Sequence, residues 1–126
     1  MLVERIEGKW IDVFARVFEM CAVDKTQTAA ILSETQSRSV NVNLAELALD
    51  RLGIRPIHIV LPTLRQNSPV PVRSTGASDA IAGSTAVIKA LASVDFVVDC
   101  TVEGLLHAPE LPEILADGSR VLMVSN

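Results

Sequence analysis

Two kinds of hydrophobic pattern alternate along this chain. In some segments apolar residues recur every three or four positions, which is typical of a helix with one buried face. In others every residue over a short run is apolar, which is typical of a strand covered on both faces. The first pattern predicts helices over residues 9–21, 40–52, 86–92 and 109–116. The second predicts strands over residues 28–32, 56–61, 95–100 and 120–124.

Residues next to these segments indicate where the helices begin and end. Gly53 is a natural stop after the second helix, and Pro109 is a favourable first residue for the last one. The longest irregular segment, residues 62–84, is expected to be a loop. The expected buried helix positions are Ala45, Ala48, Leu49 and Leu52, then Val87, Ala90 and Leu91, while Trp10, Phe14 and Phe18 are expected in the core or a subunit interface.

The alternation of helices and fully apolar strands predicts the fold class. We expect one three-layer α/β/α domain over residues 1–126, with a mainly parallel four-stranded sheet that is doubly wound, flavodoxin- or Rossmann-like. The last predicted strand, 120–124, looks central, yet only two residues follow it. We therefore expect the amino-terminal domain of a longer chain. The alternative is a small complete fold whose last strand lies at the sheet edge.

Composition removes several classes of function. The 126 residues carry a net charge of −4, with one tryptophan, three phenylalanines and no tyrosine. Neither nucleic acid nor an anionic membrane is an expected partner, since basic patches and stacking aromatics are lacking. No apolar run is long enough to span a membrane, and the first eight residues do not form a secretory signal. Cys21 and Cys100 are expected to be reduced thiols, and the protein to be cytoplasmic.

Sequence motifs for nucleotide binding and for common nucleophiles are absent. There is no G-x-G-x-x-G, no G-x-x-x-x-G-K-[ST], no G-x-S-x-G and no C-x-x-C. The loop residues Ser74, Thr75, Gly76, Ser78 and Gly83 resemble an anion-binding loop in composition only. A plain flexible loop is the favoured interpretation.

Two histidines are candidates for chemistry. His58 lies within a predicted strand, where a hydrogen-bonded structural role is favoured. His107 follows the carboxyl end of the third strand, where open α/β sheets bind ligands, and Glu110 could orient its ring. From position alone, a functional role and a capping or solvent-exposed role for His107 both stay open. For Asp99, accepting hydrogen bonds from loop amides is favoured over a role in catalysis, and no complete metal site is expected in this chain.

The segment VVDCTVEGLLHAPE, residues 97–110, resembles a known family. It is similar to the pattern V-V-D, a spacer and L-L-H-[SA]-P-E of the 2,5-dihydroxypyridine 5,6-dioxygenases. These ring-cleaving enzymes of nicotinate degradation are related in fold to the thermophilic aminopeptidase (aminopeptidase T) group. Weaker similarity at residues 23–28, 60–62 and 118–122 extends the resemblance over nearly the whole chain.

The resemblance implies a mononuclear non-heme iron(II) enzyme with a small aromatic substrate. Its two-histidine, one-carboxylate ligands would lie in a carboxy-terminal domain that this chain lacks, so no metal ligand is expected here. The family histidine corresponds to His107, which would be an auxiliary acid/base. Ala108 replaces the family's serine, which removes any hydroxyl role at that position.

Two alternative functions are also possible, and we expect the protein to form a homo-oligomer. The chain could belong to a metal-dependent, aminopeptidase-like protein, which would use two metal ions and release amino acids. It could also be a non-catalytic interaction or oligomerisation domain. Apolar surface left uncovered around residues 121–124 is expected to drive self-association, so a homo-oligomer is predicted.

Overall fold

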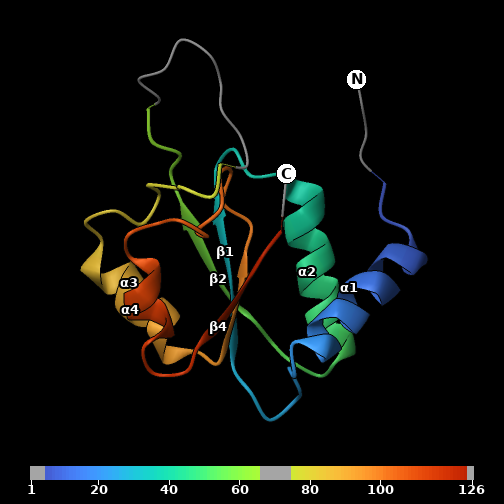
Figure 1. Ribbon diagram of the computed structural model, residues 1–126. Coiled ribbons are helices and arrows are strands. Elements are labelled where there is room, and N and C mark those ends of the chain that lie inside the picture. Colours follow the sequence, from blue (N-terminus) through green and yellow to red (C-terminus); the bar gives the residue numbers. More distant parts are fainter. Residues whose placement is uncertain (1–4, 66–74, 125–126) are drawn as a thin grey trace.

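The computed structural model describes residues 5–65 and 75–124 and has an α/β fold (Figure 1). Its elements are α1 (Gly8–Met20), β1 (Ala29–Glu34), α2 (Ser39–Arg51), β2 (Ile57–Leu61), α3 (Thr85–Ser93), β3 (Phe96–Asp99), α4 (Leu111–Leu115) and β4 (Arg120–Met123). The strands form one four-stranded sheet in the order β2-β1-β3-β4. All three strand pairs are parallel, which confirms the predicted sheet.

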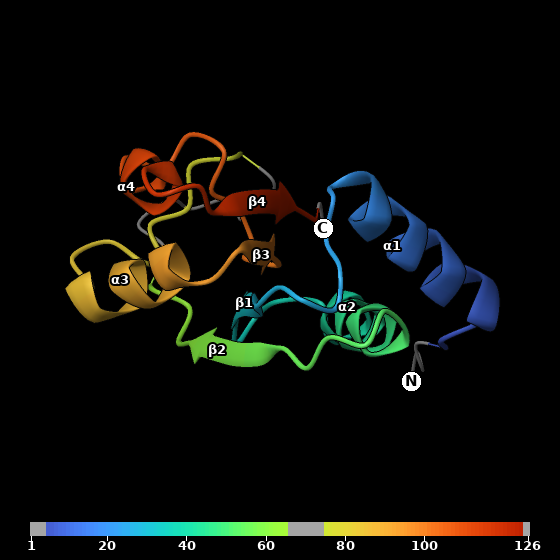
Figure 2. The ribbon, with the colours of Figure 1, turned by 90° about the horizontal axis from the view of Figure 1, so that it is seen from below.

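Helices cover both faces of this sheet. Figure 2 shows α1 and α2 on one face and α3 and α4 on the other. Each face has its own hydrophobic cluster, because successive side chains of a strand point to opposite sides. Ile31 and Val98 belong to the cluster under α1 and α2, whereas Leu32 and Val97 belong to the cluster under α3 and α4. The three-layer prediction is therefore confirmed.

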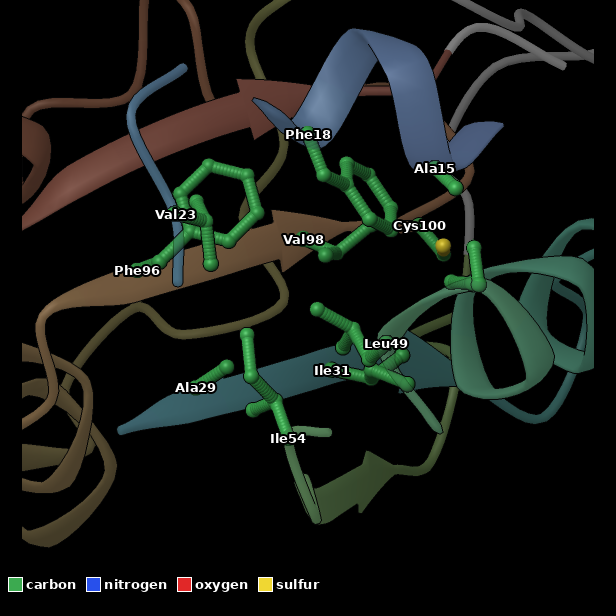
Figure 3. Packing of buried hydrophobic residues seen from close by; sticks show 12 residues of the cluster. Ala15, Phe18, Val23, Ala29, Ile31, Leu49, Ile54, Phe96, Val98 and Cys100 are labelled. Carbon is green, nitrogen blue, oxygen red and sulfur yellow. The ribbon is translucent and has the colours of Figure 1, made fainter. Parts of the chain in front are cut away.

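Aromatic packing joins α1 to the centre of the sheet. Phe18 of α1 lies edge-on to Phe96 of β3, with 5.5 Å between the ring centroids (Figure 3). Leu49 of α2 and Ile31 of β1 belong to the same buried cluster. Phe14, one turn earlier in α1, contacts Phe18, but Trp10 is 39% exposed. The aromatic residues of α1 thus enter the core only at the end of the helix nearest the sheet.

The expectation that every strand is buried on both faces is wrong for β2. Ile57 and Val60 are 56% and 60% exposed, because the strand order places β2 at one edge of the sheet. β4 lies at the other edge and is only partly buried. A continuous apolar run shows that a segment can pack on both faces, but it does not distinguish an edge strand from a central one.

Several element boundaries also differ from the predictions. β1 continues beyond the predicted end at residue 32 through Ser33 and Glu34, and both are buried. The last helix begins at Leu111 rather than at Pro109, because two successive turns precede it. In α3, Ile88 is buried whereas Ala90 is exposed, so the buried face of that helix is rotated from the expected one.

Three further sequence predictions concern membrane-spanning helices, the two cysteines and self-association. In the described part of the chain, no helix is both long and apolar enough to cross a membrane. Cys21 and Cys100 are free thiols, as expected. An apolar groove of about 190 Å³ runs between α1 and residues 122–124. Self-association through this surface stays a prediction.

Candidate functional site

The candidate site lies at the carboxyl edge of the sheet, where β1 and β3 end side by side. The chain leaves β1 toward α2 on one face and leaves β3 toward α4 on the other (Figure 2). This is the switch point of the sheet, the place where open α/β folds form a ligand crevice. The loop after β3, residues 100–110, carries His107 and starts at this point.

Asp99, the last residue of β3, accepts hydrogen bonds from several groups of that loop. Its side chain is fully buried. Its Oδ1 atom accepts hydrogen bonds from the Thr101 N–H at 3.0 Å and the Thr101 hydroxyl at 2.6 Å, and its Oδ2 atom accepts from the Leu105 N–H at 2.7 Å. Thr101 Oγ1 in turn accepts the Gly104 N–H at 3.1 Å. The predicted role of Asp99, an acceptor for loop amides, is confirmed.

A second segment, residues 75–78, is bonded to the same loop. The Gly76 N–H donates to the Glu103 carbonyl at 2.5 Å, and the His107 N–H donates to the Gly76 carbonyl. The Ser78 N–H donates to the Gly104 carbonyl at 2.8 Å. Gly76 and Ser78 are buried, so the interpretation of this part as a plain flexible loop is wrong. Ser74 lies outside the described residues.

Gly76 is in close contact with the His107 ring. A β-carbon added at Gly76 would lie 3.0 Å from His107 Cδ2, and the backbone there has a φ of +79°. Both facts favour glycine, because a side chain would be strained and would push on the ring. The His107 side chain is exposed, and within the described residues its ring nitrogens have no hydrogen-bond partner. Within the described part of the chain, the imidazole is therefore accessible to a ligand.

Glu110, which was considered as a partner for His107, forms no hydrogen bond with it in the described structure. Its Oε2 atom is buried and has no hydrogen-bond partner among the described residues. The Glu110 carbonyl accepts bonds from the first turn of α4. The position of the His107 ring is thus set by its own backbone and by Gly76.

Glu34 joins the site from β1 and was missed by the sequence analysis. It is only 7% exposed, and its Oε2 atom accepts the Val102 N–H. Ser37 bridges the same gap: its hydroxyl donates to the Cys100 carbonyl at 2.6 Å and accepts the Glu34 N–H at 2.8 Å. These bonds tie the end of β1 to the loop after β3. Nothing in the sequence indicated that Glu34, two residues after an apolar run, would be buried.

Burial dominates the electrostatics of this edge. Loss of solvent raises the pKa of Glu34 above its usual value. The hydrogen bond from the Val102 N–H opposes this shift, and the negative charges of Asp79, Asp99 and Glu103 add to it. Burial also raises the pKa of Asp99, although its hydrogen bonds from the loop oppose the shift. The same cause, with the Asp99 charge, raises the pKa of the Cys100 thiol to about 12. Cys100 is therefore an unreactive thiol at neutral pH.

The raised pKa of Glu34 predicts an unusual dependence of stability on pH. The folded protein binds this proton more tightly than the unfolded chain, so the stabilisation is full below the ordinary carboxyl pKa and is lost as pH rises through the native value. Glu34→Gln cannot titrate, so its free energy of unfolding should rise relative to that of the wild type over the same pH range. Urea unfolding at a series of pH values measures this difference. A difference that does not change with pH would contradict the prediction.

The two histidines do not come together. His58 lies in β2, where its Nε2 atom is 2.8 Å from Glu46 Oε1 on α2, as expected of a hydrogen-bonded structural histidine. His107 lies beyond the end of β3, two strands away. Across residues 5–65 and 75–124, no group of three histidine, cysteine, aspartate or glutamate side chains is placed to hold a metal ion.

Comparison with known proteins identifies the family. The family model for NicX, 2,5-dihydroxypyridine 5,6-dioxygenase, matches residues 9–126. A Pseudomonas putida KT2440 protein named 2,5-dihydroxypyridine 5,6-dioxygenase is 33% identical over 113 residues, which are 88% of this chain and 32% of that protein. The solved structure of 2,5-dihydroxypyridine dioxygenase from the same organism superimposes with a TM-score of 0.84 and 30% identity, covering 97% of this chain and 35% of that one. This chain thus spans about a third of these relatives, and it belongs to the 2,5-dihydroxypyridine 5,6-dioxygenase family.

Proposed function

We propose that this chain is part of a ring-cleaving dioxygenase that acts on 2,5-dihydroxypyridine or a close analogue, as in nicotinate breakdown. The observation that carries the proposal is the family match over residues 9–126. The resemblance of residues 97–110 to the family motif supports His107 as the counterpart of the family histidine in L-L-H-[SA]-P-E. Its exposed ring on a loop held at the switch point is a suitable place for an acid/base group.

In this proposal His107 moves protons to and from the aromatic substrate. Opening a dihydroxylated ring requires a base to remove a hydroxyl proton, and later an acid to return a proton to the product. Imidazole suits both roles because its charge changes close to neutral pH. The ring nitrogens of His107 have no competing partner among the described residues, so one of them can accept the hydroxyl proton directly.

Iron(II) is proposed for the whole protein, where it would supply the dioxygen chemistry. The described residues do not bring three suitable ligands together. We propose that the ligands come from the part of the family's chain that this one does not span. That region and the substrate are therefore the partners proposed for the loop that carries His107.

The test measures dioxygen uptake and loss of the aromatic absorbance with 2,5-dihydroxypyridine and iron(II). It compares the full-length natural protein that contains residues 1–126 with the 126-residue chain alone. We expect uptake coupled to ring loss in the full-length protein, and neither uptake nor iron retained after dialysis in the chain alone. 2-Hydroxypyridine, which lacks the second hydroxyl, serves as the control substrate. Release of amino acids from peptides without oxygen uptake would contradict the proposal.

A further inference from the structure

We propose that Glu34 is a positioning residue for the reaction, because its carboxylate reaches from β1 to the Val102 N–H and fixes the loop that presents His107. The inference rests on the proposed function of His107. It adds a residue from a different strand, outside the segment that resembles the family motif.

A short series of backbone contacts connects Glu34 to His107. Val102, which Glu34 holds, is followed by Glu103, whose carbonyl accepts the Gly76 N–H at 2.5 Å. The Gly76 carbonyl then accepts the His107 N–H. No flexible side chain interrupts this series after Glu34, so a displacement of Val102 is transmitted to the backbone of His107.

Asp99 cannot replace Glu34 in this role. Asp99 and the amides it accepts all belong to β3 and its own loop, so its bonds determine the shape of the loop internally. Glu34 belongs to β1, and its bond determines where the loop lies relative to the neighbouring strand. The Ser37 hydroxyl adds a second tie at Cys100, at the start of the loop, but not at its centre.

The electrostatic surroundings of Glu34 argue against a role in stability alone. The side chain is nearly fully buried, and within the described part of the chain the charges that raise its pKa belong to acidic residues, Asp79, Asp99 and Glu103. Burying a carboxylate near other acidic groups is costly to the fold. The side chain also places an acceptor oxygen on the Val102 N–H, and this contact, rather than the charge, is what the proposed role requires.

The experiment separates loss of the hydrogen bond from loss of the charge. Glu34→Met keeps the length of the side chain but removes the acceptor, whereas Glu34→Gln keeps an acceptor oxygen. In Glu34→Met, amide hydrogen exchange at Val102 and His107 should become about tenfold faster or more, because the Val102 N–H loses the Glu34 carboxylate and the loop that carries His107 is held less firmly. In the full-length enzyme, kcat should fall by about 10- to 100-fold with KM nearly unchanged, as expected when a reacting group is misplaced. Glu34→Gln should restore both values to near those of the wild type.

Glu46→Met is the matched control, because Glu46 is an exposed glutamate whose partner, His58, lies away from the loop. It should leave exchange and kcat unchanged. Wild-type exchange at Val102 and His107 in Glu34→Met would overturn the inference. If Glu34→Met does not fold, the Val102 amide resonance is followed against pH: it should move as Glu34 titrates in the wild type and stay fixed in Glu34→Gln. A Val102 resonance that does not move with pH in either protein would overturn the inference. Fast exchange in Glu34→Met together with normal turnover in His107→Ala would refute only the proposed function.

Discussion

Replacing His107 with alanine is expected to slow ring cleavage by about 10²–10⁴-fold, the usual contribution of a positioned proton-transfer group. This corresponds to about 3–5 kcal/mol of transition-state stabilisation, more than an exposed histidine without a catalytic role would supply. The fold should be unaffected, since the ring is exposed. Iron content and ring-cleavage rate are to be measured on the same preparation of the full-length enzyme.

Two controls make this result specific. His58→Ala removes the other histidine, which bonds only Glu46 among the described residues, and should leave the rate unchanged. Added imidazole should restore part of the activity of His107→Ala, because it supplies the missing acid/base group. Loss of iron together with activity would make His107 a metal ligand, and an unchanged rate would make it a structural residue.

Replacing Gly104 with alanine is expected to destabilise the protein by about 2–5 kcal/mol. The backbone φ of +84° costs an L-residue about 1–2 kcal/mol. In addition, the new β-carbon would overlap the Met123 sulfur, and such overpacking costs about 1–3 kcal/mol. Gly104 also donates its N–H to Thr101 and accepts the Ser78 N–H, so the loop cannot move away without losing hydrogen bonds.

Gly118→Ala is the matched control for this prediction. Gly118 has a φ of +96°, but nothing lies within 4 Å of its added β-carbon. In urea unfolding, Gly118→Ala should therefore lose only the free energy that the positive φ costs, about 1–2 kcal/mol. The difference between the two variants measures the contact with Met123. Equal losses in the two variants would show that Met123 moves aside without cost.

Much of the fold could be predicted from the sequence because hydrophobic periodicity reports directly on burial. The apolar run of β3 and the spaced apolar positions of α2 correspond to elements within one or two residues of the predicted bounds. The exposure of Ile57 and Val60 could not be predicted, because strand order is decided by long-range pairing. The rotation of α3 was missed for a similar reason: alanine is compatible with either face of a helix, and Ile88 took the buried position.

The site was predictable only where its residues act within one segment. Asp99 bonds amides two and six residues further on, so its place before a loop was sufficient to predict its role. Glu34 bonds an amide 68 residues away, and no local pattern predicts such a partner. Gly76 was taken for a plain loop residue because its contact with His107 exists only once the two loops meet. The acid/base role of His107 stays a prediction.

The parallel sheet also has a consequence for how this chain is made. Thr28 and Asp95, which bond to each other where β1 and β3 begin, are 67 residues apart. β1 therefore leaves the ribosome long before its central partner exists, and parallel pairs of such separation form slowly. Until then only β2 can pair with it, and β2 exposes Ile57 and Val60 even in the finished domain. We therefore expect nascent chains to associate most readily before β3 is made, through the unpaired edge of β1 and the exposed apolar side chains of β2.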